Sequence, residues 1–484
     1  MTTTADNGSK AVKSSIWYTI ANISLRAVAI ITTPIYTGML TNAEYGKANT
    51  FNSWIDVFNV FACLCVVYSI GRAKLDFKDK FDEYMSALQG LSSSFGLVLL
   101  VFAFIFRQAL SGWIKYEVPL AVGLFAYLCV SPSVEYMMQK CRYEYRYKEN
   151  ILISVITVVG QVGLSVSLML LFNDSRYIGK ILGVMIPTAA MGIVFYIRFI
   201  VKGKVFYNRQ YWTYALKIGL PMIPHALALI LLAQMDRIMI KDIIGDADAG
   251  LYIFGYSFAT LLMVFTNAIG QAWLPWFNET LFAGGRERIR QIQKKLVMLG
   301  CFLSFGFIVA APEALMLLAI SNDTYWIAKF VVPPIVLGTL AQYFYTNYVN
   351  VEIFLKKTPF IAIGSCLAAA INYVLNAAFI PRYGYISAAY TTLASYLILM
   401  VLHFIMVRFV LKEKVYDDLY MFVSMIVMIA VGFVFLGLYN DGIKYIIIRY
   451  ALATAITGVF AIANRRDIIT LVNYVKKRFF GKHG

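Results

Sequence analysis

The sequence predicts an all-α integral membrane protein with about fourteen membrane-spanning helices, arranged as two six-helix lobes followed by two more helices. Of its 484 residues, 60% are hydrophobic and 14% are charged, whereas about a quarter of the residues in a soluble domain are charged. The hydrophobic residues lie in long blocks, and a helix needs about 20 of them to cross a bilayer core. Short matches between the two halves of the chain indicate an internal repeat.

The predicted spans are the hydrophobic blocks between clusters of charged residues. The first block follows a polar N-terminus and contains Arg26 but no cleavage site of small residues, so we expect it to stay as a spanning helix. The predicted spans are 15–39, 44–70, 83–106, 117–138, 149–172, 179–200, 213–239, 250–277, 294–318, 327–351, 358–380, 385–409, 416–438 and 442–463.

The distribution of Lys and Arg predicts the orientation of these spans. Cytoplasmic loops of membrane proteins are enriched in Lys and Arg. When the N-terminus is placed in the cytoplasm, most of the 43 basic residues fall in cytoplasmic segments. One helix more or fewer would scramble this alternation. We therefore expect an even number of spans with both termini in the cytoplasm, and we attribute the net charge of +17 to membrane topology.

The predicted organisation has five parts. They are a cytoplasmic N-terminal tail (1–14), an N-lobe of six spans (15–205), a C-lobe of six spans (206–412), two further helices (413–463) and a basic, amphipathic cytoplasmic tail (464–484). In the last tail, apolar residues recur at helical spacing beside Lys476, Lys477 and Arg478. This pattern fits a helix lying on an anionic membrane surface, or a solvated tail.

Two pairs of segments indicate that the lobes are copies of one unit. GMLTNAEYG at 38–46 aligns with DIIGDADAG at 242–250, and YIRFIVK at 196–202 resembles MVRFVLK at 406–412. Six spans return the chain to the side on which it started, so the two copies would share one orientation, related by an axis along the membrane normal. Transporters built from such repeats usually bind their substrate between the two halves.

Several classes of function lack their motifs in this sequence. It contains no GxxxxGK[ST] loop for ATP and no GxSxG nucleophile, and its 3 histidines are not spaced as a zinc site. The 6 cysteines form no CxxC pair, which favours small core residues over disulfides or metal ligands. The basic residues are spread over short loops, which argues against nucleic acid as a partner. We therefore expect a transporter, not an enzyme, with no catalytic residues, no metal and no cofactor.

Polar residues in the first two spans lie on single helix faces. Asn22 and Arg26 are four residues apart in the first span, and Asn52, Asp56 and Asn59 follow the i, i+4, i+7 pattern in the second. Charged residues within a membrane usually face a cavity or a partner. The two stripes predict the wall of a watered cavity. A compatible alternative is that Arg26 and Asp56 pair and hold the two helices together.

The seventh span carries three further candidates. His225 and Asp236 are eleven residues apart and therefore share a helix face, with Arg237 beside them. Because Asp236 and Arg237 lie near the far end of the span, exposure at the membrane surface is the alternative to a role in the cavity. Pro221 and Pro224 fall in the predicted first turn, where proline costs little.

Other polar residues recur at helical spacing in later spans. Asn side chains often form hydrogen bonds between membrane helices, so these groups favour interhelical bonding over ligand binding. The groups are Asn267 with Gln271, Tyr343 with Asn347 and Asn350, and Asn372 with Asn376. Glu313 and Arg449 are isolated charges within predicted spans, and the sequence assigns them no role.

Three stretches resemble the Wzx-type oligosaccharide flippases of the MOP (multidrug/oligosaccharidyl-lipid/polysaccharide) superfamily. RAVAIITTPIYTGMLTNAEYG at 26–46 is similar to the first-helix signature of that family, and GLPMIPHALALILLAQMDRIMI at 219–240 is similar to the start of its second lobe. Residues 354–404 resemble its tenth-to-twelfth-helix segment. One departure is Gly38, where relatives often carry a basic residue near the outer mouth.

The resemblance implies a multi-pass protein of the bacterial plasma (inner) membrane that works by alternating access. Its cargo would be polyprenyl-diphosphate-linked oligosaccharide, moved from the cytoplasmic to the outer leaflet for assembly of O-antigen, capsule or exopolysaccharide, with assembly enzymes as candidate partners. Burying a diphosphate requires cationic donors. The implied substrate-binding residues are Arg26, Arg237, Asn22, Asn52, Asn59 and His225, and the candidates for a coupled H+ or Na+ are Asp56 and Asp236.

Two other functions remain open at this stage. A MATE-like multidrug or cation antiporter of the same superfamily would need an acidic or aromatic cavity for cationic drugs, whereas Arg26 favours an anionic cargo. A membrane-embedded polysaccharide polymerase or ligase is less favoured, because the sequence contains no long exterior loop and because it carries the six-plus-six repeat.

Overall fold

The computed structural model describes residues 32–463 and 465, apart from 145, 356 and 441. Within these residues every regular element is a helix, which confirms the predicted all-α class. The predicted N-terminal tail, most of the first span and the C-terminal tail beyond Arg465 lie outside the described residues.

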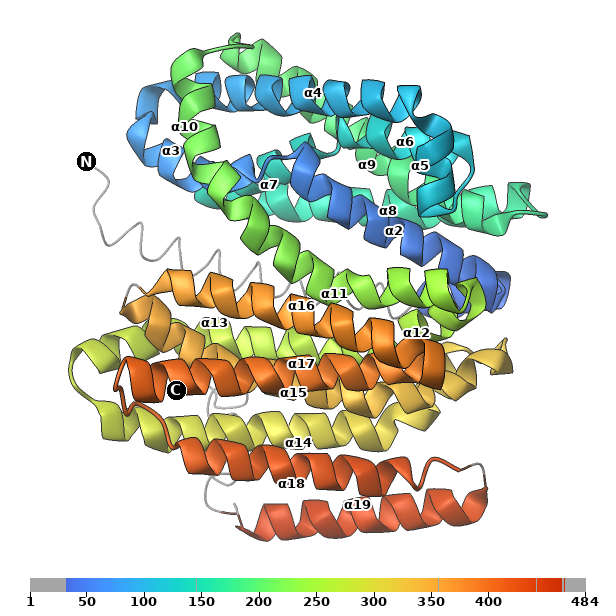
Figure 1. The fold of residues 1–484 in the computed structure, drawn as a ribbon, viewed down its shortest axis with the longest axis vertical. Coiled ribbons are helices and arrows are strands. Elements are labelled where there is room, and N and C mark those ends of the chain that lie inside the picture. Colours follow the sequence, from blue (N-terminus) through green and yellow to red (C-terminus); the bar gives the residue numbers. More distant parts are fainter. Residues whose placement is uncertain (1–31, 145, 356, 441, 464, 466–484) are drawn as a thin grey trace, which may run out of the picture.

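The helices form two groups, one above the other in Figure 1. The upper group, here called the N-group, consists of α2 (Asn42–Ala62), α3 (Ile70–Asp76), α4 (Phe81–Ile105), α5 (Arg107–Ile114), α6 (Val118–Leu128), α7 (Pro132–Tyr143), α8 (Tyr147–Leu171) and α9 (Arg176–Gly203). α10 (Arg209–Gly219) and α11 (Ile223–Ile243) then run obliquely from this group to the lower one. The predicted lobe boundary between residues 205 and 206 falls in the loop that precedes α10.

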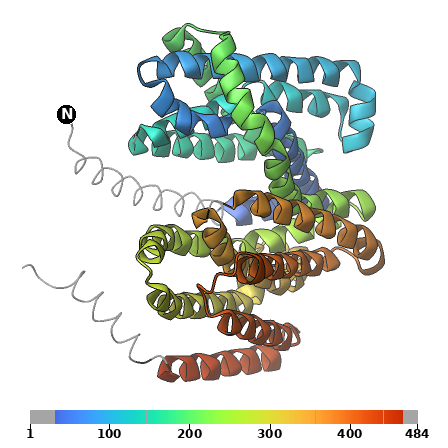
Figure 2. The same cartoon turned by 60° about the vertical axis from the view of Figure 1, so that its left-hand side comes forward.

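The lower group, here called the C-group, contains the rest of the chain. Its helices are α12 (Asp246–Ala259), α13 (Leu261–Phe282), α14 (Arg286–Leu318), α15 (Val332–Phe354), α16 (Thr358–Tyr383), α17 (Ile386–Ile405), α18 (Asp418–Leu436) and α19 (Ile443–Ala463). The last two, α18 and α19, lie at the outer edge of the C-group, on the side away from the N-group (Figures 1 and 2).

Eleven helical segments among the described residues are long and apolar enough to cross a membrane, and 12 if the bent pair formed by α2 and Val66–Lys74 counts as one span. They match the predicted spans except the first and the seventh. The first lies largely outside the described residues, and the seventh, interrupted at Leu220–Met222, is not among the eleven. The structure thus supports a multi-pass membrane protein, with fourteen spans remaining a prediction.

Several predicted spans are not single continuous α-helices in the structure. The second bends by 55° after Ala62, where Leu64 and Cys65 adopt positive φ angles of 48° and 51°; such a conformation costs about 1 kcal/mol or more per non-glycine residue. The fourth breaks before Pro132, and in the seventh Pro221 lies in a 3-10 turn that precedes α11. Proline lacks the N–H that a continuing helix needs.

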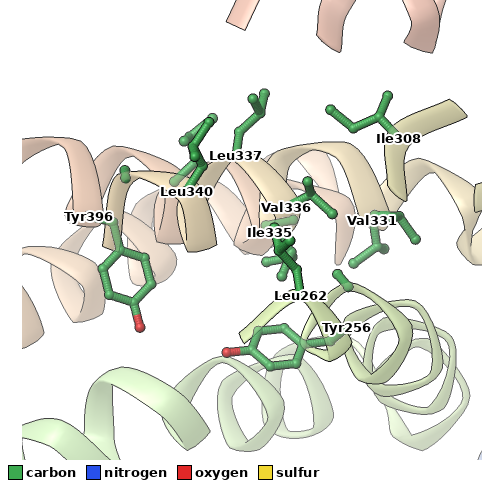
Figure 3. Packing of buried hydrophobic residues seen from close by; sticks show 14 of the residues in the cluster. Tyr256, Leu262, Ile308, Val331, Ile335, Val336, Leu337, Leu340 and Tyr396 are labelled. Carbon is green, nitrogen blue, oxygen red and sulfur yellow. The ribbon is translucent and has the colours of Figure 1, made fainter. Parts of the chain in front are cut away.

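The centre of the C-group is α15, which packs against helices on several sides. Ile335, Leu337 and Leu340 are at most 2% exposed and belong to one cluster with Ile308 of α14 and Tyr396 of α17 (Figure 3). Lipid is as apolar as these side chains, so close packing holds such a core together, and removal from water contributes little. This packing fixes the positions of the helices that carry the polar residues described below.

The two groups meet where α2 crosses α12, toward the right of Figure 1. A Cβ atom added at Gly46 would lie 1.8 Å from the carbonyl oxygen of Asp246, and one added at Gly250 would lie 2.0 Å from that of Asn42. Only glycine allows backbones to approach this closely. The contact is reciprocal, because Asn42 and Asp246, like Gly46 and Gly250, are equivalent positions of the predicted repeat.

Polar contacts join the two groups beside this crossing. They are Thr37 Oγ1 to the Leu318 carbonyl (3.0 Å), Thr324 Oγ1 to Asn42 Oδ1 (3.0 Å), and the ion pair of Lys115 Nζ with Asp242 Oδ1 (3.2 Å). We call the crossing and these three contacts the sealed end of the molecule. Thr37 is only 1% exposed there, so the two groups are in close contact at this end.

Candidate functional site between the two helix groups

The polar stripe predicted on the second span lies on α2. Asp56 is exposed, and Asn52 and Asn59 are half-buried, whereas Ser53, Ile55 and other neighbours on α2 are buried against the protein. The Asn59 amide oxygen accepts a hydrogen bond from the Cys63 thiol at 3.0 Å. Three of the predicted residues therefore lie together on one side of α2.

A glutamine on α11 connects this stripe to the C-group. Gln234 Nε2 donates to Asp56 Oδ2 at 2.9 Å, and Gln234 Oε1 accepts from Ser53 Oγ, also at 2.9 Å. Arg237 donates to the same Gln234 Oε1 from Nη1 at 2.8 Å. One amide thus links Asp56 to Arg237, and the structure brings these two predicted site residues together across the boundary between the groups.

The charge of Arg237 has no direct ionic partner among the described residues. Its guanidinium carbon lies 4.9 Å from the ring centre of Tyr256, and its buried Nε atom has no hydrogen-bond partner within the described part of the chain. An arginine held by an aromatic face and an amide keeps most of its donors for another ligand. Arg237 is therefore a cation available to an anionic ligand at the boundary between the groups.

Asp236, the neighbour of Arg237 in sequence, points into the C-group and is 1% exposed. Its carboxylate accepts three hydrogen bonds, from Tyr252 Oη, Thr392 Oγ1 and Asn376 Nδ2, each 2.6 Å long. Asn376 also donates to Asn372 at 3.1 Å. We call these residues of α11, α12, α16 and α17 the Asp236 cluster. Its donors to Asp236 are all neutral.

The alternative that Asp236 is exposed at the membrane surface is wrong, because its side chain is enclosed by protein. Arg237 lies against Tyr256 of α12 and bonds to Gln234. Of the other predicted residues, Arg26 and Asn22 lie outside the described residues. His225 belongs to the first turn of α11, and its side chain also lies outside what is described. The predicted interhelical bonding of Asn372 and Asn376 is confirmed, because Asn372 donates to Thr392 of α17 and Asn376 donates to Asp236 of α11.

Sequence reasoning missed Gln234, Ser53 and Tyr256, the partners of Asp56 and Arg237. Gln234 precedes Arg237 by three residues and so shares its helix face, a signal that could have been used. Ser53 and Tyr256 carry no such signal, because their relevance depends on which helices meet in the fold.

The sequence also gave no indication of a buried acid–histidine pair in the C-group. Glu352 Oε1 of α15 lies 2.8 Å from His403 Nδ1 of α17. Both side chains are at most 3% exposed. The isolated charges Glu313 and Arg449 likewise form an ion pair that joins α14 to α19. Buried charges in membrane proteins are usually paired in this way.

Comparisons with known proteins agree with this architecture. The family model "Polysaccharide biosynthesis protein" matches residues 11–281. A Haemophilus influenzae protein, "Lsg locus putative protein 1", is 24% identical over 327 residues, which cover 66% of this chain and 77% of that protein. An "uncharacterized membrane protein" of the same organism is 24% identical over 282 residues, which cover 56% of this chain and 66% of that protein.

Solved structures show the same fold. The lipid II flippase MurJ in an inward closed conformation aligns with a TM-score of 0.71 at 14% identity, covering 94% of this chain and 100% of MurJ. An inward-facing multidrug resistance MATE family transporter of the MOP superfamily aligns with a TM-score of 0.58 at 11% identity, covering 85% and 98%. The chain therefore shares its fold with these two transporters. Since the family model matches more than half of the sequence, the chain belongs to the polysaccharide biosynthesis protein family.

Proposed function

We propose that the protein is a flippase that moves polyprenyl-diphosphate-linked oligosaccharides from the cytoplasmic to the outer leaflet of the bacterial inner membrane. The observation that carries the proposal is Arg237, a cation at the boundary between the two helix groups with no carboxylate partner among the described residues. A family of polysaccharide biosynthesis proteins supports a glycan cargo, and such cargo is presented to membranes on a lipid diphosphate.

Arg237 is suited to a diphosphate by its geometry. A guanidinium group offers several donors in a planar fork that matches two phosphate oxygens. Only one of its nitrogens, Nη1, forms a hydrogen bond within the described residues, to Gln234. A diphosphate oxygen would replace the neutral amide with a charged acceptor, which is the stronger bond. Arg26 is the second proposed cation, placed by resemblance to the first helix of the family.

Asp56 is the proposed site of a coupled proton. Gln234 links this carboxylate to Arg237, because Gln234 donates to the first and accepts from the second. An arriving diphosphate adds negative charge near Asp56, which favours proton binding by the carboxylate. Asp236 is the second candidate for a coupled H+ or Na+, since its buried carboxylate is bonded only to neutral donors among the described residues.

In this proposal the sealed end faces outward and both termini lie in the cytoplasm. The loops on the opposite side of the molecule hold most of the basic residues, as the orientation rule for membrane proteins requires of a cytoplasmic face. The structure would then represent a state closed to the outside, and transport would require the α2–α12 crossing to open.

The proposal can be tested with purified protein in proteoliposomes and a fluorescent polyprenyl-diphosphate oligosaccharide. We expect Arg237→Ala to slow transfer between leaflets by about tenfold or more, the loss expected for one charge-assisted hydrogen bond of 1.5–3 kcal/mol, and Arg237→Lys to retain part of the rate. The control is Arg107→Ala, since Arg107 is exposed and bonds only to a carbonyl of its own chain segment. Normal transfer by Arg237→Ala, or export of small cationic dyes instead of the lipid, would contradict the proposal.

A further inference from the structure

A polar cavity of about 250 Å³ lies between α13 and α15, within the C-group. Amide and aromatic side chains dominate its lining, and no charged residue contributes to it. These side chains include Asn267, Gln342, Asn347 and Asn350, together with Trp273 and Tyr343. The cavity is separate from the Asp236 cluster, whose residues belong to α11, α12, α16 and α17.

Three of the amides in this cavity have unused hydrogen-bonding capacity. Asn350 is only 7% exposed yet forms no side-chain hydrogen bond with any described residue, and the same holds for the exposed Asn267. Asn347 donates to the carbonyls of Tyr343 and Phe344 at 3.2 and 3.3 Å, which leaves its own oxygen as an acceptor. An amide can donate two hydrogen bonds and accept two, so the cavity offers both donors and acceptors to a ligand.

The polar lining indicates that this cavity does not face the lipid hydrocarbon. Amides without partners are costly against lipid, because nothing in hydrocarbon can satisfy them. This side of α13 and α15 is therefore wetted or filled by a polar ligand. The interhelical bonding predicted for Asn267 and Asn350 is not found among the described residues, in contrast to Asn372 and Asn376, which bond to each other and to the Asp236 cluster.

A lipid-linked glycan has three parts, a diphosphate, a polyprenyl tail and sugars, and the cavity lining fits only one of them. A diphosphate would need a cation, and none lines the cavity; a polyprenyl tail would leave the amides unsatisfied. A sugar matches both features, because its hydroxyl groups donate and accept hydrogen bonds and its C–H faces pack against aromatic rings such as Trp273 and Tyr343. We propose that this cavity binds an uncharged sugar of the transported glycan; the inference rests on the function proposed above.

The position of the cavity suits this role. Tyr256, which lies against Arg237, and Thr266, which lines the cavity, belong to the consecutive helices α12 and α13. Ten helical residues correspond to about 15 Å, so a diphosphate at Arg237 would place the first few sugars within reach of the cavity. Among the described residues α13 packs against α12, α14 and α15 of the C-group.

The test is binding to purified protein of two lipids, the polyprenyl-diphosphate oligosaccharide extracted from the cells that make this protein and the synthetic polyprenyl diphosphate without sugar. We expect Asn350→Ala to weaken binding of the glycan-bearing lipid by about tenfold, the loss of one or two hydrogen bonds, and to leave binding of the sugar-free lipid unchanged. Asn267→Ala should act in the same direction, and because Asn267 is exposed this variant keeps its fold. The matched control is Asn440→Ala, which removes an exposed amide between α18 and α19.

The outcomes separate the two proposals. If both alanine variants bind both lipids as the wild type does, or weaken both lipids equally, the sugar site is wrong and the flippase proposal stands. If the wild-type protein binds neither lipid, the proposed function itself fails and the sugar site falls with it.

Discussion

Asp236 and Arg237 are adjacent in the chain, but their side chains lie in different surroundings. Each residue turns an α-helix by about 100°, so Asp236 points from α11 into the C-group while Arg237 points toward α2 and Tyr256. Asp236 is enclosed and satisfied by three neutral donors. Arg237 keeps donors free, and the functional proposal depends on that difference.

Replacing Asp236 should mainly affect stability. Asp236→Ala would leave the donors of Tyr252, Thr392 and Asn376 buried without their acceptor, at a cost of about 2 kcal/mol or more. Asp236→Asn keeps an acceptor oxygen and should cost less. Thermal unfolding in detergent measures both effects.

The matched control is Asp56→Asn, because Asp56 is exposed and accepts a single hydrogen bond. We expect its melting temperature to equal that of the wild type. If Asp236→Ala were as stable as Asp56→Asn, the Asp236 cluster would not hold the C-group helices together, and Asp236 would be free for a role as an ion site alone.

Part of this site could be read from the sequence. Helical spacing put Asn52, Asp56 and Asn59 on one face of α2 and identified Arg237 as an intramembrane cation. The hydrogen bonds of Gln234 with Asp56 and Ser53 could not be predicted, because they depend on how α11 packs against α2. The same limitation explains why Asn267 and Asn376, similar in their spacing patterns, differ in surroundings.

At the scale of elements, the α2–α12 crossing is where a small change should have the largest effect. Gly46→Ala would place a Cβ atom 1.8 Å from the Asp246 carbonyl, so the helices must separate and the sealed end must loosen. We expect a cysteine introduced at the buried position Thr37 to react several times faster with a water-soluble maleimide in the Gly46→Ala background. Peptide mass spectrometry distinguishes this cysteine from the natural ones.

Gly123→Ala on α6 is the control for this experiment, since an added Cβ atom there meets nothing within 4 Å. Its labelling rate should match that of the parent. Equal labelling in a folded Gly46→Ala protein would show that the crossing does not govern access to Thr37.

Hydrophobic blocks were sufficient to predict most of the helices but not their breaks. A block of apolar residues indicates membrane depth, and it says nothing of a left-handed backbone such as that of Leu64 and Cys65. Proline gave partial information: Pro224 lies in the first turn of α11 as expected, whereas Pro221 helps to form a separate 3-10 turn. Local backbone conformation of this kind is set by packing between helices.

At the scale of the whole molecule, transport by alternating access requires the two helix groups to part at the sealed end. Asn42 and Thr324 contact each other there across the groups, with Oδ1 and Oγ1 3.0 Å apart. A disulfide between Asn42→Cys and Thr324→Cys should therefore stop lipid transfer in proteoliposomes, and a reducing agent should restore it.

A disulfide within one group should not have this effect. Gln161 of α8 and Thr188 of α9 are bonded at 2.9 Å inside the N-group, so Gln161→Cys with Thr188→Cys is the control. Undiminished transfer with the Asn42–Thr324 disulfide fully formed would mean that cargo crosses without separation of the groups at this end.

The predicted repeat is the feature of the whole molecule for which the sequence offers the most direct indication. The short match between 38–46 and 242–250 contains Gly46 and Gly250, the two residues whose backbones meet at the crossing. The resemblance to the family was based on residues 26–46, which include this stretch, and on residues 219–240 and 354–404. The cargo could not be derived in this way, since the contacts that select it come from side chains on several helices.

The most direct measurement of the central claim is the transfer of fluorescent polyprenyl-diphosphate oligosaccharide between the leaflets of proteoliposomes that contain only this protein. The account predicts transfer that depends on the protein and falls strongly with Arg237→Ala. Absence of transfer, together with expulsion of small cationic dyes by the same vesicles, would contradict the flippase function and identify an antiporter.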